Sequence, residues 1–371
     1  MIGFILSGFV PLLELPNYVI LSFRNGITMQ YLPIGKLKHD LLKKLLPICD
    51  VNTDVIVGPQ IGEDAAVMDI GDKYLVATSD PITFATEDIG WYVVCVNSND
   101  IAAMGATPKW LLVTLLLPES ATTTDMVEDI MAQITDACFQ FNIALCGGHT
   151  EITPTVTQPV VIGQMIGVVD KDALVTSSGG SVNDDLILTK GVGIEATAII
   201  ARECENQLKE KYDTQLLNNA KNYLIDPGIS VIKDAEIAVA TGGVHAMHDV
   251  TEGGVTTAVH ELATASNLGA LIYSEKLLNS SKMYSDITKT LCEMFQLSPL
   301  GVISSGALLI ASDPDYSDMI CQKLNNAAID AEIIGKLTPL NAGKWLAHAE
   351  NNKEPLPIFE TDEITKLFST E

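Results

Sequence analysis

The stretch "NSNDIAAMGA", residues 97–106, decides most about the fold of this chain. It closes a longer run, "DIGWYVVCVNSNDIAAMGA" (88–106), whose apolar and small residues favour a helix. Asp88 suits the N-terminal cap of that helix, and Gly105 suits its C-terminal stop. The sequence therefore predicts one helix that carries several polar residues close to its end.

Asp100 lies in the apolar stripe of this helix. Its neighbours at three- and four-residue steps are Val93, Val96 and Met104. We therefore expect its carboxylate to point where these side chains point, toward a sheet. Burial of a lone aspartate is costly, so this carboxylate needs a counter-charge or a ligand.

Three further segments place carboxylates beside small or apolar residues. They are "GEDAAV" (62–67), "TSDP" (78–81) and "GGHTEI" (147–152). A single aspartate of this kind is usually a turn or cap residue, but Asp64, Asp80 and Asp100 together favour a shared site. Two carboxylates about 4 Å apart repel each other by roughly 4 kcal/mol at an effective dielectric constant of about 20. A cation removes this cost, and all-oxygen ligands suit Mg²⁺.

The composition excludes several classes of function. The chain has 371 residues and 47% hydrophobic content, so we expect two domains, and its positive mean hydropathy excludes a disordered chain. Its formal net charge of −25 makes nucleic-acid backbones and anionic membrane surfaces poor partners. Seven scattered cysteines without a C-x-x-C pair indicate reduced, mostly core residues in a cytoplasmic protein.

The first 28 residues are apolar but are interrupted by Pro11, Glu14 and Pro16. They lack the basic leading segment and the small-residue cleavage site of a signal peptide. No stretch reaches the roughly 18 uninterrupted apolar residues that a membrane span needs. We therefore expect neither export nor a membrane span, while an upstream start and a docking arm both stay open.

Strand and helix signals follow each other irregularly along the chain. Strands are expected at 65–71 and 73–80, joined by a tight turn at Gly71-Asp72, and a helix, a strand, a helix and two strands follow. This order is not a regular βαβ repeat, so the predicted fold class is α+β. The Ser-, Gly- and Asn-containing loop 175–184 marks a junction to a second domain with long helices.

The polar segments occur in an order that resembles a known family. "GEDAAVM", "TSDPI", "NDIAAMGATP" and "GGHTE" are similar to the motif series of the aminoimidazole ribonucleotide (AIR) synthetase superfamily. "DVTEGGV" (249–255) resembles the glycine loop of its second domain. The group includes thiamine monophosphate kinase, selenophosphate synthetase and the hydrogenase-maturation protein HypE. The resemblance covers residues 33–340, and "NDIAAMGATP" is its most specific element.

The resemblance implies an α+β, PurM-like fold of two domains. Its parts are an N-terminal extension (1–32), an ATP-binding domain (33–175), an α/β C-terminal domain (183–340) and a loosely attached acidic tail (341–371). It also implies a homodimer whose first domains share a β-barrel. ATP would lie in a cleft between the domains and along that interface.

The resemblance also assigns roles to individual residues. Mg²⁺ on the phosphates of ATP would be held by Asp64, Asp80 and Asp100, with Glu151 as a further ligand. The nucleotide would be contacted by Gly62, Asn99, Gly147, Gly148, Thr150, Gly253 and Gly254. Catalytic roles would fall to His149, Asp249 and the phosphate-contacting Lys36.

Two features depart from the family pattern. Relatives carry an aspartate after the double glycine, where this chain has His149. A neutral imidazole is a poor Mg²⁺ ligand, but it can donate to a phosphate or act as a base. HypE ends in a reactive cysteine that accepts a carbamoyl group, whereas this chain ends in "EITKLFSTE" and its last cysteine is Cys321.

We therefore expect an MgATP-dependent enzyme that activates the oxygen of an amide or a small acid by phosphoryl transfer. Two alternatives stay open: a HypE-like maturation factor that works with a partner protein, and a non-catalytic nucleotide sensor. The substrate itself is not encoded in any motif.

Other candidate residues are weaker. His245 and His248 are three residues apart, but no third ligand of the zinc type lies near them in the sequence. His260 and Glu261 are expected on a helix surface or partly in the core.

Overall fold

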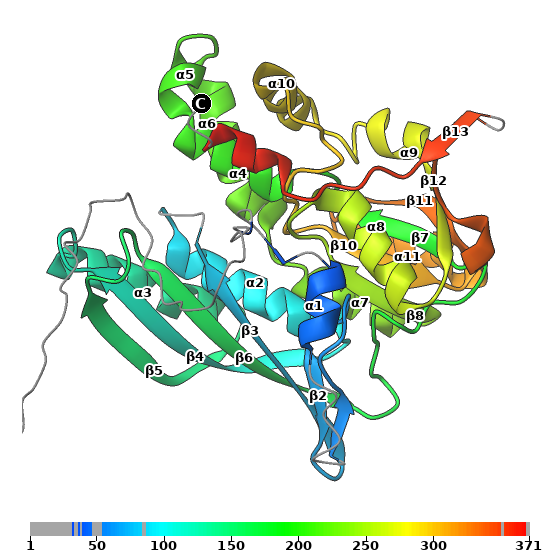
Figure 1. The fold of residues 1–371 in the computed structure, drawn as a ribbon, viewed down its shortest axis with the longest axis horizontal. Helices are drawn as coiled ribbons and strands as arrows, with labels where there is room; N and C mark the ends of the chain where they lie inside the picture. Colours follow the sequence, from blue (N-terminus) through cyan, green and yellow to red (C-terminus); the bar gives the residue numbers. More distant parts are fainter. Residues whose placement is uncertain are drawn as a thin grey trace, which may run out of the picture. The chain divides into compact units, whose positions relative to one another are not determined.

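The computed structural model describes residues 32, 36–37, 39–46, 54–83, 87–349 and 352–368. From Gly35 to Glu371 the chain forms one compact unit that contains two β-sheets (Figure 1). The predictions for residues 1–28 lie outside the described residues.

In the described part of the first domain, six strands form a sheet of order β1-β2-β3-β6-β4-β5. The strands are β1 (Val55–Val57), β2 (Ala66–Asp69), β3 (Lys73–Ile82), β4 (Thr107–Pro118), β5 (Ala144–Thr153) and β6 (Val160–Asp170). The helices of this half of the chain are α1 (His39–Leu45), α2 (Ile89–Ala103) and α3 (Thr124–Gln140). β2 and β3 pair in antiparallel fashion around the predicted turn at Gly71.

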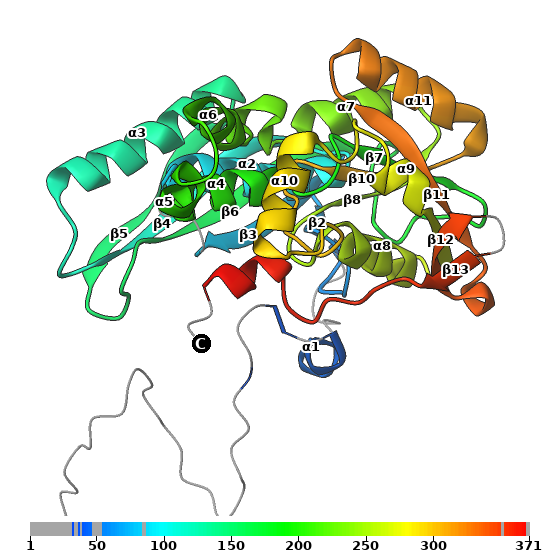
Figure 2. The same cartoon turned by 90° about the horizontal axis from the view of Figure 1, so that it is seen from above.

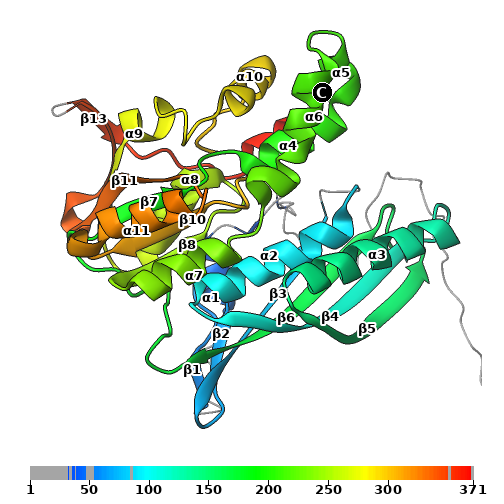
Figure 3. The same cartoon turned by 180° about the vertical axis from the view of Figure 1, so that it is seen from behind.

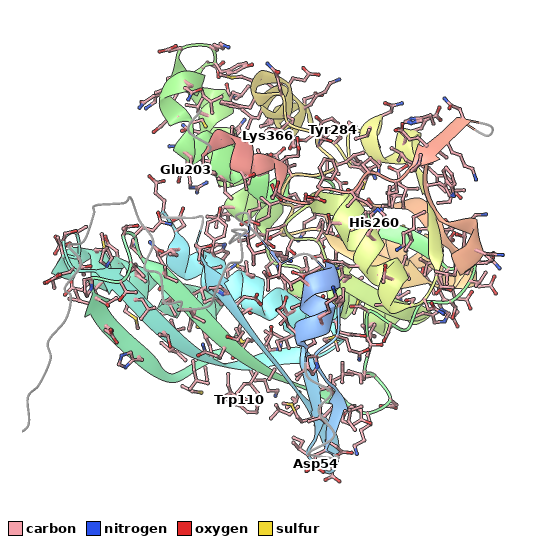
Figure 4. All side chains as sticks on the ribbon, viewed as in Figure 1. Asp54, Trp110, Glu203, His260, Tyr284 and Lys366 are labelled. Carbon is pink, nitrogen blue, oxygen red and sulfur yellow. The ribbon has the colours of Figure 1, made fainter. Side chains whose placement is uncertain are left out.

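Among the described residues, α2 and α3 cover one face of this sheet, and no helix covers the other (Figure 3). In β4, Leu111, Val113, Leu115 and Leu117 are buried in the core that α2 and α3 share with the sheet. Trp110 has the opposite orientation, is 39% exposed and projects from the other face (Figure 4). This alternation is typical of a sheet with one face packed and the other left open within the chain.

The second domain is built on a seven-stranded sheet of order β13-β12-β9-β11-β7-β10-β8, counted over the described residues. Its strands are β7 (Asp185–Thr189), β8 (Val244–Asp249), β9 (Gly269–Tyr273), β10 (Leu308–Ser312), β11 (Ala331–Thr338), β12 (Lys344–Ala349) and β13 (Asn352–Pro355). All pairs are antiparallel except β12 with β9.

Helices lie on both faces of the second sheet. The helices of this half of the chain are α4 (Ile194–Glu203), α5 (Glu205–Lys209), α6 (Thr214–Asn222), α7 (Ile232–Thr241), α8 (Gly254–Ala265), α9 (Ser274–Leu278), α10 (Asp286–Phe295) and α11 (Pro314–Asn326), with short turns η1 (Leu224–Gly228), η2 (Leu340–Ala342) and η3 (Glu363–Leu367). Of these, α7, α8, α9 and α11 contact the strands of the sheet, whereas α4, α5, α6 and α10 pack mainly on one another. Figure 2 shows α8 on one side of this sheet and α7 with α11 on the other.

α2 is buried on all sides because it packs against both domains. It contacts β3 and β6 of the first sheet and also α7 and β8 of the second domain. The side chain of Asn99 donates to the carbonyl of Ile229 and accepts from the amide of Val231, each at 2.8 Å. These two buried bonds attach the end of α2 to the loop before α7.

The predicted C-terminal stop of α2 is confirmed, whereas the predicted N-terminal cap is not. Gly105, with a φ of +69°, lies just past the end of the helix and stops it as expected. Asp88 is the first flanking residue, but its side chain caps no amide of the helix. Its carboxylate instead forms an ion pair of 2.9 Å with Arg202 on α4, so it joins the two domains.

The described C-terminal residues, 341–349 and 352–368, belong to the fold, which corrects the prediction of a loosely attached tail at 341–371. β12 and β13 extend the second sheet. Leu346, Leu356 and Ile364 are only 2%, 3% and 2% exposed. The prediction was based on the acidic composition of the segment, which does not reveal these three buried apolar side chains.

None of the helices in the described residues combines the length and apolar character that a bilayer crossing requires. The described cysteines are free, and four are buried, as the sequence predicts. Cys146 on β5 is exposed and departs from that expectation.

Candidate functional site

Four aspartates from four separate segments interact where the first domain meets the second. Asp64 precedes β2, Asp80 lies in β3, Asp100 lies near the end of α2, and Asp249 ends β8. Burial is the main cause that raises the pKa of Asp100, and the charges of the other three aspartates raise it further. The four carboxyl groups therefore form one electrostatic cluster, called the acidic cluster below.

The hydroxyl of Thr78 joins three of these segments. Its Oγ1 donates to Asp100 Oδ2 at 2.6 Å and lies 3.3 Å from Asp80 Oδ2. The same oxygen is 3.4 Å from the backbone oxygen of Asp64. Three aspartates that are distant in sequence thus lie around a single side chain of β3.

Asn97 fixes the position of Asp80. Its Oδ1 accepts from the backbone amide of Asp80 at 2.9 Å, and its Nδ2 donates to the carbonyls of Val93 and Asp80. Gly163 on β6 leaves room for this amide, because a Cβ there would lie 2.5 Å from Asn97 Nδ2. The amide group is fully buried, so its bonds hold β3 and α2 in one register.

His248 lies between two carboxylates. Its Nδ1 is 2.5 Å from Asp64 Oδ1, and its Nε2 is 2.9 Å from Glu261 Oε2. Burial alone lowers the pKa of His248, but the charges and hydrogen bonds of Asp64 and Glu261 outweigh burial and raise it well above its ordinary value. His248 is therefore a cation beside the acidic cluster, and the atoms left for a metal ion are oxygens.

Two oxygens of the acidic cluster have no partner among the described residues. They are Asp64 Oδ2 and Asp249 Oδ2, both buried. One ligand atom each of Asp64, His248 and Asp249 lies within 4.8 Å of the others. Burial, then repulsion by Asp64, raises the pKa of Asp249 to about 8. Unpartnered carboxylate oxygens that repel one another fit a hard divalent cation such as Mg²⁺.

This repulsion predicts a pH-dependent effect of Mg²⁺ on stability. The pKa values of Asp100 and Asp249 are raised above the ordinary value of about 3.9, so folding of the metal-free protein becomes less favourable as the pH rises through these values. Mg²⁺ offsets the negative charges that form. We expect Mg²⁺ to raise the melting temperature more at about pH 9 than at about pH 6, measured by thermal unfolding. An equal effect at both pH values would contradict a metal site in the cluster.

The glycine loop, residues 249–254, is held from two directions. Lys36 Nζ forms an ion pair of 3.0 Å with Glu252 and donates to Thr251 Oγ1 at 3.0 Å. Asp362 of the C-terminal segment accepts from the backbone amide of Gly253 at 2.7 Å. The side chain of Lys36 is 54% exposed, and its contacts with Glu252 and Thr251 hold its ammonium group at the loop.

The structure corrects the expectation that Glu151 shares an ion with the aspartates of its own chain. His149 and Glu151 pair with Thr114 and Leu116 of β4, and so lie on the open face of the sheet, whereas Asp80 lies on the face covered by α2. β6 and β4 also separate β5 from β3, about 14 Å at three strand spacings. Asp249 is the fourth carboxylate of the cluster instead.

The other predicted residues of β5 are exposed. Thr150 pairs with Leu115, on the face that the helices cover, and Gly147 has open space around it. Gly148 has a packing reason to be glycine, since a Cβ there would lie 1.8 Å from the carbonyl oxygen of Val113.

Several predicted nucleotide contacts have structural roles within the chain. Both polar atoms of the Asn99 side chain are used by the loop before α7, which removes Asn99 from the candidate nucleotide set. A Cβ on Gly254 would lie 2.7 Å from the carbonyl oxygens of Leu300 and Val302. Gly62 similarly packs on α8, and Gly253 is bonded to Asp362. These glycines permit close packing of backbone on backbone.

Two residues of the site, Thr78 and Asn97, were not predicted from the sequence, and two others, His248 and Glu261, were predicted in other roles. His248 was considered only as half of a zinc-type pair with His245. Glu261 was expected at a helix surface or in partial core, yet it is 8% exposed and pairs with His248. Thr78 and Asn97 stand inside the quoted "TSDP" and "NSND" segments, so those segments contained a signal for them.

The family profiles of the AIR synthase related proteins match both domains. The profile of the N-terminal domain matches residues 62–169, and that of the C-terminal domain matches residues 181–344. The chain belongs to the AIR synthase related protein family. The resemblance inferred from the motifs is thereby confirmed, and the matched residues include the acidic cluster and the glycine loop.

Curated relatives of this AIR synthase related protein span most of its length. A putative hydrogenase expression/formation protein of Methanocaldococcus jannaschii is 28% identical over 322 residues, which cover 83% of this chain and 90% of the relative. A selenide, water dikinase of Haemophilus influenzae is 26% identical over 331 residues, with 82% and 90% covered.

Solved structures share the two-domain α+β fold. A chain of the HypE–HypF complex superposes with a TM-score of 0.70 at 20% identity, covering 86% of this chain and 99% of that one. Thiamine monophosphate kinase from Aquifex aeolicus gives 0.63 at 21% identity, covering 85% and 97%. At these identities the likeness shows the fold alone.

Proposed function

We propose that this AIR synthase related protein binds MgATP and transfers its terminal phosphoryl group to an oxygen of a small amide or acid. The observation that carries the proposal is the meeting of four aspartates, two of them with unpartnered oxygens, at the domain junction. The names of relatives support it, because they include selenide, water dikinases, a thiamine monophosphate kinase and a HypE protein in complex with ATP.

The side chains suit a polyphosphate held through a metal ion. Asp64, Asp80, Asp100 and Asp249 would hold Mg²⁺, which when bound supplies positive charge to the phosphates. Lys36, whose ammonium group lies at the glycine loop, would contact a phosphate oxygen. Phosphoryl transfer depends mainly on positioning and charge neutralisation, and Asn97 and Thr78 keep the carboxylates in place for both.

We extend the proposal to a homodimer. In the described part of the chain no helix covers the second face of sheet β1–β6, and Trp110 projects from that face with 39% of its surface exposed. Pairing of two such sheets into a barrel would bury the open face. His149 and Glu151 lie on it, so in this arrangement they act at the interface and not in the acidic cluster of their own chain.

A second candidate function is a maturation factor that acts with a partner protein. The 28% identity with a putative hydrogenase expression/formation protein favours it, and so does the fold shared with a chain of the HypE–HypF complex. Turnover of ATP by the purified protein would distinguish the phosphotransferase and the maturation factor, which both use ATP, from a sensor that binds ATP without turnover.

Calorimetry of ATP binding with and without Mg²⁺ tests the proposal directly. We expect tight binding only with Mg²⁺, because the acidic cluster repels free ATP. Asp100→Asn keeps the shape of the side chain but removes a charge, and should weaken MgATP binding at least about tenfold.

Asp72→Asn is the matched control, because Asp72 is an exposed acid in the turn between β2 and β3. It should bind MgATP as the unmodified protein does. Equal affinity with and without Mg²⁺ in all three proteins would reject the metal site.

A further inference from the structure

A pocket of about 520 Å³ lies between the two domains, at the end of α2 opposite to the acidic cluster. The first domain supplies residues of α2 and α3 to its lining, and the second supplies residues of α4, α6 and η1. Trp91 and Asp88 line the pocket and lie about 14 and 18 Å from Asp100 along the axis of α2, at about 1.5 Å per residue. The pocket has the size of a small-molecule site and is separate from the proposed metal site.

The walls of this pocket are fixed by bonds within the protein. The guanidinium group of Arg202, whose side chain is 12% exposed, donates to Asp88 Oδ2 at 2.9 Å and to the carbonyl of Lys221 at 2.9 Å. In the first domain, Gln133 Oε1 accepts from the backbone amide of Gly90 at 3.0 Å. A ligand would therefore enter a pocket whose walls are already positioned, which lowers the cost of binding.

Both cationic side chains of the lining are paired with carboxylates. Arg202 pairs with Asp88 at 2.9 Å and with Glu87 at 3.7 Å, and Lys221 pairs with Glu205 at 2.9 Å. An anionic ligand would have to compete with these carboxylates for each cation. The formal net charge of the chain, −25, adds to this repulsion. The charge distribution therefore disfavours an anion in the pocket.

Three polar side chains of the lining have no partner among the described residues. Asp136 of α3 forms no ion pair there, and the side-chain amides of Asn218 and Asn222 on α6 form no hydrogen bond there. All three are exposed, so a ligand can reach them. A carboxylate and two amide oxygens are acceptors, and a primary ammonium group has three donors to offer them.

The rest of the lining is apolar. The ring of Trp91 is positioned by Phe141, with the ring centroids 5.5 Å apart and the planes at 45°. Leu224 and Ile225 of η1 complete this part of the lining and are 1% and 56% exposed. An indole ring packs well against other apolar groups and also attracts a cation over its face. The lining therefore suits a cation that carries an apolar body.

We propose that this pocket binds a small primary amine with an aromatic body. The ammonium group donates to the carboxylate of Asp136 and to the amide oxygens of Asn218 and Asn222. The body packs against Trp91 and Leu224. Because the lining comes from both domains, the bound amine joins them at a distance from the acidic cluster. The amine is thus an effector and not the phosphoryl acceptor, and its binding does not depend on the proposed function.

Calorimetry with three compounds of similar shape tests the preference for a cation. Phenethylamine carries the ammonium group, 2-phenylethanol is its neutral counterpart, and 3-phenylpropionate is its anionic counterpart. For a probe of this size we expect phenethylamine to bind with a Kd on the order of 1 mM, and the other two at least about tenfold more weakly. Equal affinity for all three, tighter binding of the anion, or no saturable binding of phenethylamine below about 10 mM overturns the proposal.

Asp136→Asn tests whether the charge preference comes from the pocket. This substitution removes the charge of an exposed side chain and should weaken phenethylamine binding about tenfold. Asp129→Asn is the matched control, because Asp129 is an exposed acid of the same helix that does not line the pocket. It should bind phenethylamine as the unmodified protein does. Equal affinities of the two variants overturn the assignment of Asp136.

Trp91→Phe locates the amine by a signal other than affinity. The chain has three tryptophans, Trp91, Trp110 and Trp345, and we expect phenethylamine to change the fluorescence of the unmodified protein. Phenylalanine keeps an aromatic ring at the pocket, so the Kd by calorimetry should stay within about threefold while the fluorescence change is lost. A fluorescence change that persists in this variant would place the amine elsewhere and overturn the site.

Saturating MgATP separates this site from the proposed nucleotide site. Two distant sites bind nearly independently, so the Kd of phenethylamine should stay within about threefold when MgATP is present. Competition between the two ligands would place the amine in the nucleotide site and overturn the proposal. Absence of MgATP binding would overturn the proposed function instead, and the comparison of the three compounds would still decide the amine site.

Discussion

Asp249→Asn is expected to lower kcat/KM for MgATP turnover by about a hundred- to a thousandfold. Asp249 is 4% exposed, and its Oδ2 has no hydrogen-bond partner among the described residues. The substitution removes one negative ligand of the proposed Mg²⁺ and leaves the shape of the side chain unchanged. Steady-state kinetics with saturating Mg²⁺ measure the effect.

The same substitution should not harm the metal-free fold. The raised pKa of Asp249 shows that its ionised form is disfavoured by burial and by Asp64. Asparagine resembles the neutral form, so the melting temperature without Mg²⁺ should stay the same or rise, while the stabilisation by added Mg²⁺ decreases. Activity within about threefold of the unmodified protein would contradict Asp249 as a metal ligand.

His248→Ala is expected to lower the free energy of unfolding by about 3–5 kcal/mol in the presence of a chelator. The substitution leaves Asp64 and Glu261 buried without their shared cation. Urea denaturation followed by tryptophan fluorescence measures the loss. Added Mg²⁺ should recover part of it, because the ion supplies positive charge to Asp64.

His348→Ala is the matched control for this measurement. His348 pairs with Glu354 at 3.0 Å on the surface, where both side chains are more than one third exposed. Exposed pairs contribute little, so a change within about 0.5 kcal/mol is expected. A loss for His248→Ala as small as that of the control would show that the buried ion pair is not structurally important.

The fold class and the central helix could be predicted because their signals are local. α2 could be predicted from a continuous run of helix-compatible residues that ends in a glycine. The family could be predicted from the order of short motifs along the chain. The attachment of the C-terminal segment could not be predicted from its charge. Its anchors, such as Leu356 and Ile364, are isolated apolar residues whose partners lie elsewhere in the chain.

The candidate site also depends on contacts between distant segments, which the sequence alone does not reveal. His245 and His248 are three residues apart, which suggests one face if the segment is a helix. The segment is strand β8, where residues three apart point to opposite faces, so His245 pairs with Asp184 and His248 with Asp64 and Glu261. Similarly, His149 and Glu151 do share a strand face, but the strand order that places this face away from Asp80 is a property of the whole sheet.

The burial of α2 between the two sheets affects how such a chain can be recombined with its relatives. One side of the helix completes the packing of the first domain, and another side forms the wall against α7 and β8. A chimaera that exchanges only the second domain would therefore set a foreign loop against Asn99, and the two bonds of Asn99 persist only where that loop presents a backbone carbonyl and a backbone amide in the same positions. To transfer substrate preference from one family member to another, the residues of α2 that contact the second domain therefore have to be exchanged together with that domain.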